Sequence, residues 1–249
     1  MYQKERVDEI LKILHKNNYV NVKYLCDKIG YSKATINRDL NYMAKQKMIV
    51  RSHGGVELVD NNEIIPLRFR YHKMKNEKKR IGKAAAELVK DGDVIFIDLS
   101  STTEYMAPYL VDKKDITVIT SNIAIVAYLS EFPNIRIICM GGEIIESPSM
   151  LGGDLCVKNF MEYKADKFFF ASIGMNDNGE IVGGEIYKLL LNVMRRNSNK
   201  AIYLVDHEKV NLPAKNVLMT VNDVDAIITD YRFSDEFKAK YNNTEFVEV

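Results

Sequence analysis

The stretch NVKYLCDKIGYSKATINRDLNYM, residues 21–43, decides the fold of the first part of the chain. Asn21 is a favoured N-cap residue, and apolar residues follow it at helical spacing: Val22, Leu25 and Ile29. Gly30 favours the left-handed conformation in which helices commonly end. Ser32 then caps a second run of helical periodicity, formed by Ile36, Leu40 and Met43. The stretch therefore predicts two helices joined by a tight turn.

The flanking sequence completes a small domain. Upstream, an apolar stripe at i, i+3, i+4 and i+7 spacing predicts a helix over residues 4–16: Val7, Ile10, Leu11 and Leu14. Downstream, residues 48–58 hold two short apolar stretches on either side of Gly54-Gly55, which predicts a β-hairpin with a tight turn. Helix, helix, glycine turn, helix and hairpin is the order of a winged helix-turn-helix, and we assign residues 1–58 to it.

The polar face of the 32–43 helix has the residue types that DNA recognition uses. With its apolar residues turned inward, the outward positions are Lys33, Ala34, Thr35, Asn37 and Arg38. Arg pairs with guanine, Asn pairs with adenine, and an Ala or Thr methyl contacts thymine. Ser32 and Lys33 lie at the helix N-terminus, where phosphates bind, and Arg51 and His53 lie on the hairpin, where a wing contacts the minor groove or the backbone. The alternative is an ordinary helical hairpin with a solvated polar face.

Charge is distributed unevenly along the chain. The net charge is +1, but residues 1–56 hold eleven Lys or Arg against five Asp or Glu. Residues 84–249 hold sixteen basic and twenty-five acidic residues. The basic N-terminal segment, residues 1–56, is called the head below. A basic head in a chain that is otherwise acidic indicates that the head binds a polyanion. Residues 68–83 hold eight basic residues and one acidic residue. Three interpretations of this run stay open: a solvated helix face, an interdomain contact, or extra phosphate contacts.

Two segments of the head, SKATINRDL at 32–40 and IVRSHGGV at 49–56, closely resemble the signature of the DeoR family of bacterial repressors. The resemblance continues through almost the whole chain, at Arg68, Lys78, Ile81, 91–93, 98–103, Gly141-Gly142, Gly152 and 206–209. It implies a sensor domain similar to sugar-phosphate isomerases, a phosphorylated sugar or related metabolite as effector, and repression of a carbohydrate-utilisation operon. Asn37 departs from the family, which usually has a second Arg there, and this changes the expected base preference.

The rest of the chain predicts an α/β sensor domain. Residues 59–75 are predicted to be a linker, because Pro66 and polar residues interrupt any periodicity in 59–67. Residues 76–249 are assigned to effector binding and oligomerisation. A helix is expected over 77–90, and buried strands are expected at 94–99, 116–120, 135–140, 167–171, 201–205, 217–220 and 226–229. Apolar strands that alternate with helices predict a mostly parallel, Rossmann-like sheet covered on both faces.

The candidate effector site lies where these strands end. Ligands of open α/β sheets bind at the carboxyl ends of the strands. Hydroxyls and backbone amides suited to a phosphate follow the first strand: Ser100, Ser101, Thr102 and Thr103. Asp98 is a candidate acceptor for sugar hydroxyls, Lys209 is a candidate phosphate cation, and other strand ends contribute Ser121, Asn122, Gly141 and Gly142. The alternatives are an ordinary helix cap for the hydroxyl cluster and a solvated surface position for Lys209.

A competing hypothesis is a sugar-phosphate isomerase with an accessory N-terminal domain, in which Asp98, Glu185 and Lys209 carry out acid–base chemistry. The helix ending near Met194 departs from the family, which has a Glu and a Lys-Arg pair where this chain has Tyr187, Leu191 and Asn192. Glu185 is offset by two residues and points elsewhere, so we expect a regulator rather than an enzyme. The departures predict an unusual effector or weak binding. A third hypothesis is a regulator whose second domain only mediates oligomerisation.

Composition excludes several other classes. Hydrophobic residues make up 47% and charged residues 28%, as in soluble globular proteins, and no apolar run is long enough to span a bilayer. The three cysteines have no metal-ligand spacing and suit a reducing compartment, and the N-terminus has no secretory signal. We therefore expect a cytoplasmic protein without a metal or cofactor, whose partners are double-stranded operator DNA and a small effector. Winged-helix regulators bind paired half-sites, which predicts a homodimer or tetramer.

Overall fold

A computed structural model describes residues 3–17, 19–46, 48–52, 55–58, 70, 73–145, 149–212 and 216–249. They form two compact units, Met1–Arg70 and Tyr71–Val249. The segment between the units lies largely outside the described residues. The domain boundaries inferred from the sequence, at residues 58 and 76, therefore stay predictions.

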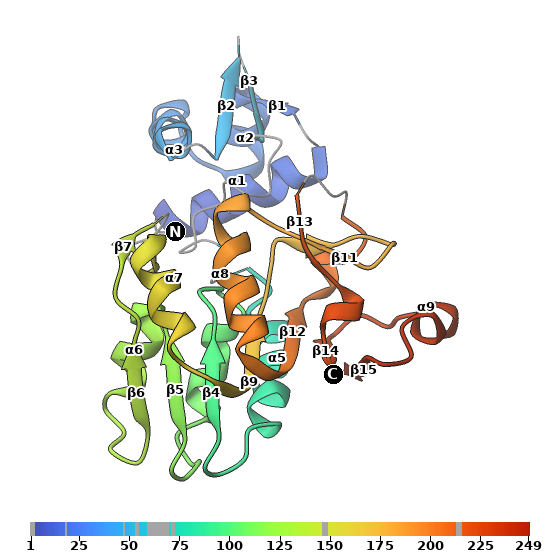
Figure 1. Ribbon diagram of the computed structural model, residues 1–249. Helices are drawn as coiled ribbons and strands as arrows, with labels where there is room; N and C mark the ends of the chain where they lie inside the picture. Colours follow the sequence, from blue (N-terminus) through green and yellow to red (C-terminus); the bar gives the residue numbers. More distant parts are fainter. Residues whose placement is uncertain are drawn as a thin grey trace. The chain divides into compact units, whose positions relative to one another are not determined.

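The first unit is a winged helix-turn-helix (Figure 1). Its elements are α1 (Gln3–Asn17), β1 (Tyr19–Asn21), α2 (Val22–Ile29), α3 (Lys33–Lys45), β2 (Ile49–Ser52) and β3 (Gly55–Leu58). The three strands form an antiparallel sheet in the order β1-β3-β2. The predicted hairpin is confirmed as β2 and β3. The third strand, β1, was not predicted from the sequence.

Local chemistry sets the helix ends of this unit. The Oδ1 atom of Asn21 accepts a hydrogen bond of 2.7 Å from the backbone N–H of Tyr24 and caps α2. Gly30 ends α2 with a φ of 76°, where a residue with a Cβ atom would be strained. Ser32 caps α3 through the N–H of Thr35. Because the caps place α2 and α3 at a fixed turn, their apolar faces meet α1 in one core of Val7, Ile10, Leu14, Leu25, Ile36, Leu40 and Met43.

The second unit is built on a parallel sheet of seven strands, in the order β15-β14-β12-β9-β4-β5-β6 (Figure 1). In chain order these are β4 (Val94–Ile97), β5 (Thr117–Thr120), β6 (Arg136–Cys139), β9 (Ala165–Phe170), β12 (Ser198–Val205), β14 (Ala226–Thr229) and β15 (Glu245–Glu248). All neighbouring pairs are parallel. The predicted class, a winged helix followed by a mostly parallel α/β domain, is confirmed.

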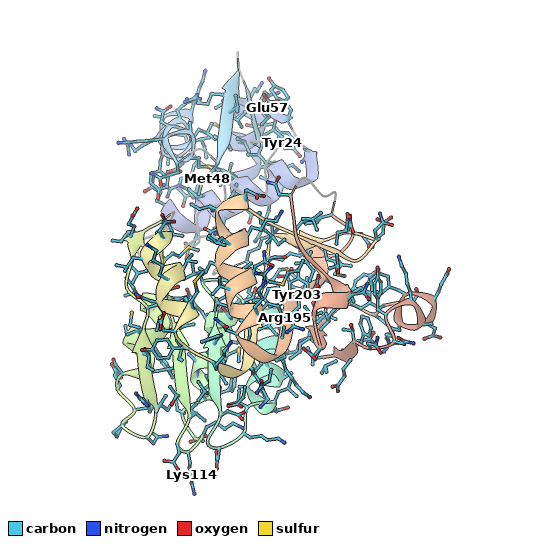
Figure 2. All side chains as sticks on the ribbon, viewed as in Figure 1. Tyr24, Met48, Glu57, Lys114, Arg195 and Tyr203 are labelled. Atoms are coloured by element: carbon cyan, nitrogen blue, oxygen red, sulfur yellow. The ribbon has the colours of Figure 1, made fainter. Side chains whose placement is uncertain are left out.

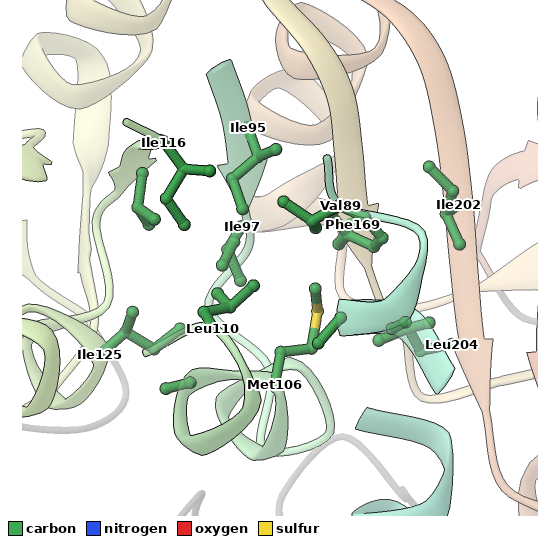
Figure 3. Packing of buried hydrophobic residues seen from close by; sticks show 14 of the residues in the cluster. Val89, Ile95, Ile97, Met106, Leu110, Ile116, Ile125, Phe169, Ile202 and Leu204 are labelled. Atoms are coloured by element: carbon green, nitrogen blue, oxygen red, sulfur yellow. The ribbon is translucent and has the colours of Figure 1, made fainter. Parts of the chain in front are cut away.

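Helices cover both faces of the sheet. Successive side chains of a strand point to opposite faces, so Ile95 and Ile97 of β4 pack on one side and Phe96 on the other. The first face is covered by α5 (Lys75–Glu87), the 3₁₀ helix η2 (Thr103–Tyr109) and α6 (Ile123–Leu129), and Figure 3 shows Met106, Leu110 and Ile125 against Ile97 and Phe169. The second face is covered by α7 (Gly153–Met161) and α8 (Glu185–Arg196).

One predicted strand belongs to a different sheet. Residues 217–220 form β13 (Val217–Thr220), which pairs antiparallel with β11 (Glu180–Val182) and, through it, with β10 (Gly174–Met175). A run of three apolar residues and a threonine fits a short antiparallel ladder as well as a parallel one, so its composition alone does not assign the sheet. The remaining elements are β7 (Glu143–Ile144), β8 (Leu151–Gly152), η3 (His207–Lys209), η4 (Val221–Asp223) and α9 (Asp235–Lys240).

The parallel strands give the second unit two distinct edges. Figure 2 shows Lys114 at the edge where β5 begins, with Tyr203 inside the sheet on β12. The opposite edge, at the carboxyl ends, carries the polar residues that follow β4, β5, β12 and β14: Asp98, Ser121, Asp206 and Asp230.

Candidate functional site

The outward face of α3 presents the residues that the sequence analysis assigned to DNA. Lys33, Ala34 and Arg38 are exposed, and Thr35 and Asn37 are half-buried. The opposite face is buried, with Ile36, Leu40 and Met43 fully inside the core. Ser32 is exposed at the N-terminus of the helix, where unpaired N–H groups favour anions. The helix therefore has one polar, largely exposed face and one face fixed in the core of this unit.

A buried ion pair that the sequence analysis missed holds α3 against α1. Asp39 is fully buried and accepts hydrogen bonds from Arg6 Nε at 2.7 Å, Arg6 Nη2 at 3.1 Å and Gln3 Nε2 at 3.0 Å. The hydrogen bond that Arg6 donates to Asp39 raises the pKa of Arg6, and the Arg6 guanidinium also lies over the ring of Tyr31, 5.0 Å from its centroid. Two-point contact of this kind fixes the orientation of α3 as well as its position.

Arg51 lies on β2 and contacts α3 rather than standing apart from it. Its Nη2 donates to Asn37 Oδ1 at 2.6 Å, and its Nη1 donates to Asn41 Oδ1. Asn37 Nδ2 donates to the carbonyl of Lys33 at 2.9 Å. The structure thus brings Arg51 and Asn37 together on the outward side of α3. The other predicted wing residue, His53, lies outside the described residues.

In the second unit, the loop after β4 is organised around Asp98. Asp98 Oδ1 accepts from the N–H of Ser100 at 3.0 Å and from Thr103 Oγ1 at 2.6 Å, and Oδ2 accepts from the N–H of Ala171 at 3.0 Å. Burial raises the pKa of the Asp98 carboxyl, and these hydrogen bonds oppose the rise. Both oxygens therefore already have partners inside the protein. This favours a role in shaping the loop over the direct sugar contact that the sequence analysis considered.

Two lysines from separate elements reach this loop. Lys78 of α5 is 1% exposed, and its Nζ donates to Ser101 Oγ at 3.1 Å. Lys209 of η3 approaches the next residue, with its Nζ 3.5 Å from Thr102 Oγ1. Ser101, Thr102 and Thr103 are all buried. The hydroxyl loop and Lys209, which the sequence analysis assigned to one site, thus lie close together. Lys78 adds a second cation, which helical periodicity showed only as a polar position of the predicted helix.

Asp206, which directly follows β12, is a carboxylate at the same edge of the sheet. The sequence analysis did not select it as a candidate ligand contact. It is 1% exposed, and neither carboxylate oxygen accepts a hydrogen bond from the part of the chain that the structure describes. Lys209 Nζ lies 3.5 Å from Asp206 Oδ2. A buried carboxylate without hydrogen bonds is costly, which makes Asp206 the better candidate acceptor for ligand hydroxyls.

Of the other predicted effector residues, Ser121, Asn122 and Gly142 have local structural roles. Asn122 caps α6 through the N–H of Ala124, and its Nδ2 donates to Glu104 of η2 at 2.8 Å. The carbonyl of the neighbouring Ser121 accepts from the N–H of Leu151. Gly142 allows close packing after β6, because a Cβ atom there would come within 2.3 Å of the Gly152 carbonyl oxygen, whereas a Cβ atom on Gly141 would meet nothing within 4 Å.

Of the three side chains proposed for isomerase chemistry, Asp98 and Lys209 lie at the loop, whereas Glu185 pairs with a neighbour on its own helix. Glu185 is exposed at the start of α8, with its carboxylate 3.8 Å from Lys188 Nζ. Leu191 is buried, and Asn192 donates to the carbonyl of Lys188. Asp98 is thus held by hydrogen bonds inside the protein and Glu185 is exposed, which does not favour the acid–base chemistry considered for these two carboxylates.

His207 ties η3 to the end of β14. Asp230 accepts from the N–H of His207 at 2.8 Å and lies 2.5 Å from its Nδ1, and Arg80 Nη2 of α5 is 3.7 Å from the same carboxylate. The hydrogen bond to Asp230 raises the pKa of His207, with smaller contributions from the charges of Asp230, Asp206 and Glu208, while burial opposes the rise.

This raised pKa predicts a pH-dependent contribution to stability. Because the folded-state pKa exceeds the ordinary value of about 6.5, the contribution is fully present below that value and is lost as pH rises through the folded-state pKa. His207→Gln should therefore lower the free energy of unfolding at pH 6 and have less effect at pH 9. The loss should stay under about 1 kcal/mol, since the side chain is 46% exposed. Urea titrations at both pH values test this, and a difference independent of pH would contradict it.

The described residues contain neither a metal-binding cluster nor a membrane-spanning helix. No cluster of three or more His, Cys, Asp or Glu there is arranged to hold a metal ion. Within the same residues, no helix has the length and apolar character needed to cross a bilayer.

Comparison with protein-family models matches both units. Residues 6–62 match the DeoR-like helix-turn-helix domain, and residues 73–231 match the DeoR C terminal sensor domain. The two matches together span most of the chain.

Curated relatives align over nearly the full length. The chain is 30% identical to the HTH-type transcriptional repressor GlcR of Bacillus subtilis, covering 92% of this chain and 89% of the relative. It is 27% identical to the glycerol-3-phosphate regulon repressor of Escherichia coli, covering 92% of each. Among solved structures, ribose 5-phosphate isomerase A from Methanocaldococcus jannaschii aligns over 55% of each chain, with 18% identity and a TM-score of 0.39.

Proposed function

The chain belongs to the DeoR family of transcriptional regulators, and on that premise we propose that it represses carbohydrate-utilisation genes under the control of a phosphorylated metabolite. The DNA-binding unit places α3 in the major groove of an operator. A homodimer or tetramer would present two such helices to paired half-sites. We further propose action in the cytoplasm, because operator DNA is found there.

The observation that carries the DNA-binding role is the two-faced character of α3. Lys33, Ala34 and Arg38 are exposed on one side, while Ile36 and Leu40 anchor the other side in the core. Arg38 is proposed to contact base edges, with Ser32 and Lys33 on phosphates at the helix N-terminus. Thr35, beside them, is half-buried and contributes its methyl group at the border of the contact.

The effector role rests on the convergence of cations and hydroxyls at the carboxyl edge of the sheet. A phosphate at the Ser100–Thr103 loop would meet hydroxyls, backbone amides and the ammonium groups of Lys78 and Lys209. Asp206 would accept hydroxyl groups of the same ligand. Cations that face a phosphate and a carboxylate that faces hydroxyl groups together suit a phosphorylated polyol or sugar. Ser121, Asn122, Gly141 and Gly142 would shape the surrounding loops.

Lys209→Ala should weaken binding of a phosphorylated ligand about tenfold, because a charge-assisted hydrogen bond contributes about 1.5 kcal/mol. The measurement is a thermal-shift titration of the full chain against a panel of sugar phosphates and their unphosphorylated counterparts. Lys200→Ala is the matched control, since Lys200 is an exposed lysine near the start of β12, the strand that precedes η3 and Lys209.

The same panel separates the proposed function from its alternatives. Stabilisation by phosphorylated compounds only, with a change in DNA affinity when they are added, supports a sensor. No stabilisation by any compound would instead support a domain used only for oligomerisation. Turnover of a pentose or hexose phosphate that is lost in Lys209→Ala would contradict the regulator and support an isomerase.

A further inference from the structure

The contacts of Arg51 change what the outward face of α3 is able to recognise. The guanidinium donates to two asparagines one helical turn apart, Asn37 and Asn41. Asn41 was not selected from the sequence, and it is exposed on the same side of α3 as Asn37. Since Arg51 comes from β2, the three side chains join the wing sheet to the recognition helix.

These hydrogen bonds occupy both ends of the Asn37 amide. Its Oδ1 accepts from Arg51 at 2.6 Å, and its Nδ2 donates to the Lys33 carbonyl at 2.9 Å. Pairing with adenine uses the same oxygen and the same N–H₂ group at once. An amide oxygen accepts two hydrogen bonds and an N–H₂ group donates two, so each end of Asn37 keeps one position beyond these contacts. The two contacts fix the orientation of the amide, and they assign Asn37 first to holding Arg51 in place.

Arg51 retains donors for a partner. A guanidinium has five N–H groups, and the two asparagines take two of them. The side chain is exposed, and two amide oxygens already hold its planar group. Because a guanidinium held in advance loses less conformational entropy on binding, it discriminates better than a free arginine would.

We propose that Arg51 is a specificity-determining residue that donates to a guanine in the major groove, with Asn37 and Asn41 as its positioning residues. The inference rests on the proposed function, since it presumes that α3 enters the groove. It replaces the wing contact expected for Arg51 from the sequence with a contact on the side of α3. The chemistry favours guanine, whose O6 and N7 atoms are both acceptors for arginine.

The test uses the full chain and a duplex selected by it from a randomised pool. Affinities are measured for that duplex and for a set in which each base pair is changed singly. Arg51→Ala and Arg51→Lys should each lose about tenfold of discrimination at one G·C pair, because lysine keeps the charge but lacks the planar fork. Asn41→Ala should lose about threefold at the same pair, with an unchanged melting temperature. Lys45→Ala, an exposed cation at the end of α3, should leave discrimination intact.

Two results would overturn the inference. Uniform weakening on every duplex in Arg51→Ala, with a shallower salt dependence, would make Arg51 a phosphate contact. Full retention of discrimination in Arg51→Lys would remove the role of the planar group. A pool from which the wild-type chain selects no duplex would overturn the proposed function itself, and this inference with it.

Discussion

Replacement of Asp39 by asparagine is expected to lower the free energy of unfolding of the winged-helix unit by about 3 kcal/mol. Asp39 is fully buried and accepts two hydrogen bonds from Arg6, whose side chain is only 13% exposed. An amide in its place keeps the shape but leaves the arginine charge without its counter-charge, and its N–H₂ group faces other donors. We use the lower end of the range for a broken buried pair, because Arg6 retains some contact with solvent.

Hydrogen exchange at the amides of α1 and α3, followed in the full chain under increasing urea, measures this loss. Asp27→Asn is the matched control, since it removes the same charge from an exposed position of α2. The combined change Arg6→Met with Asp39→Leu should recover most of the stability, because an apolar pair of similar size requires no counter-charge. A loss below about 1 kcal/mol in Asp39→Asn would show that the ion pair does not hold α3 in place.

Replacement of Arg38 by alanine is expected to reduce the preference for the operator over random duplex by about tenfold to a hundredfold. Arg38 is exposed on α3 between Ile36 and Leu40, whose burial fixes the direction of this face. A base contact contributes only when the correct base is present, so affinity for random duplex should fall much less.

Fluorescence anisotropy titrations on both duplexes, at several salt concentrations, measure this difference. Lys33→Ala serves as the comparison, because a phosphate contact should weaken both duplexes alike and reduce the salt slope by about one. An equal loss on both duplexes in Arg38→Ala would assign Arg38 to the backbone instead.

Elements set by local chemistry could be predicted from the sequence. The caps at Asn21 and Ser32 and the left-handed Gly30 lie at helix ends in the structure, because each depends on neighbours within four residues. The Ser100–Thr103 loop and Lys209 were likewise predicted together, since parallel strands bring their carboxyl ends to one edge.

Features that depend on distant partners could not be predicted. Asp39 and Arg6 are 33 residues apart, and a polar residue at one helical position gives no sign that it will be buried. Lys78 is one of the positions that carry the family resemblance, but its place in a basic run gives no sign that it is buried and donates to Ser101. Asp98, predicted as a sugar contact, already has partners on its own loop and at Ala171, 73 residues away.

The most direct test of the account is selection from a randomised duplex pool by the intact chain, with sequencing of the bound fraction. Two copies of one short motif should be enriched, and enrichment should weaken at a G·C position in Arg38→Ala while Lys200→Ala leaves it unchanged. A bound fraction as random as the input at low salt, with and without sugar phosphates, would contradict the claim that α3 recognises duplex DNA.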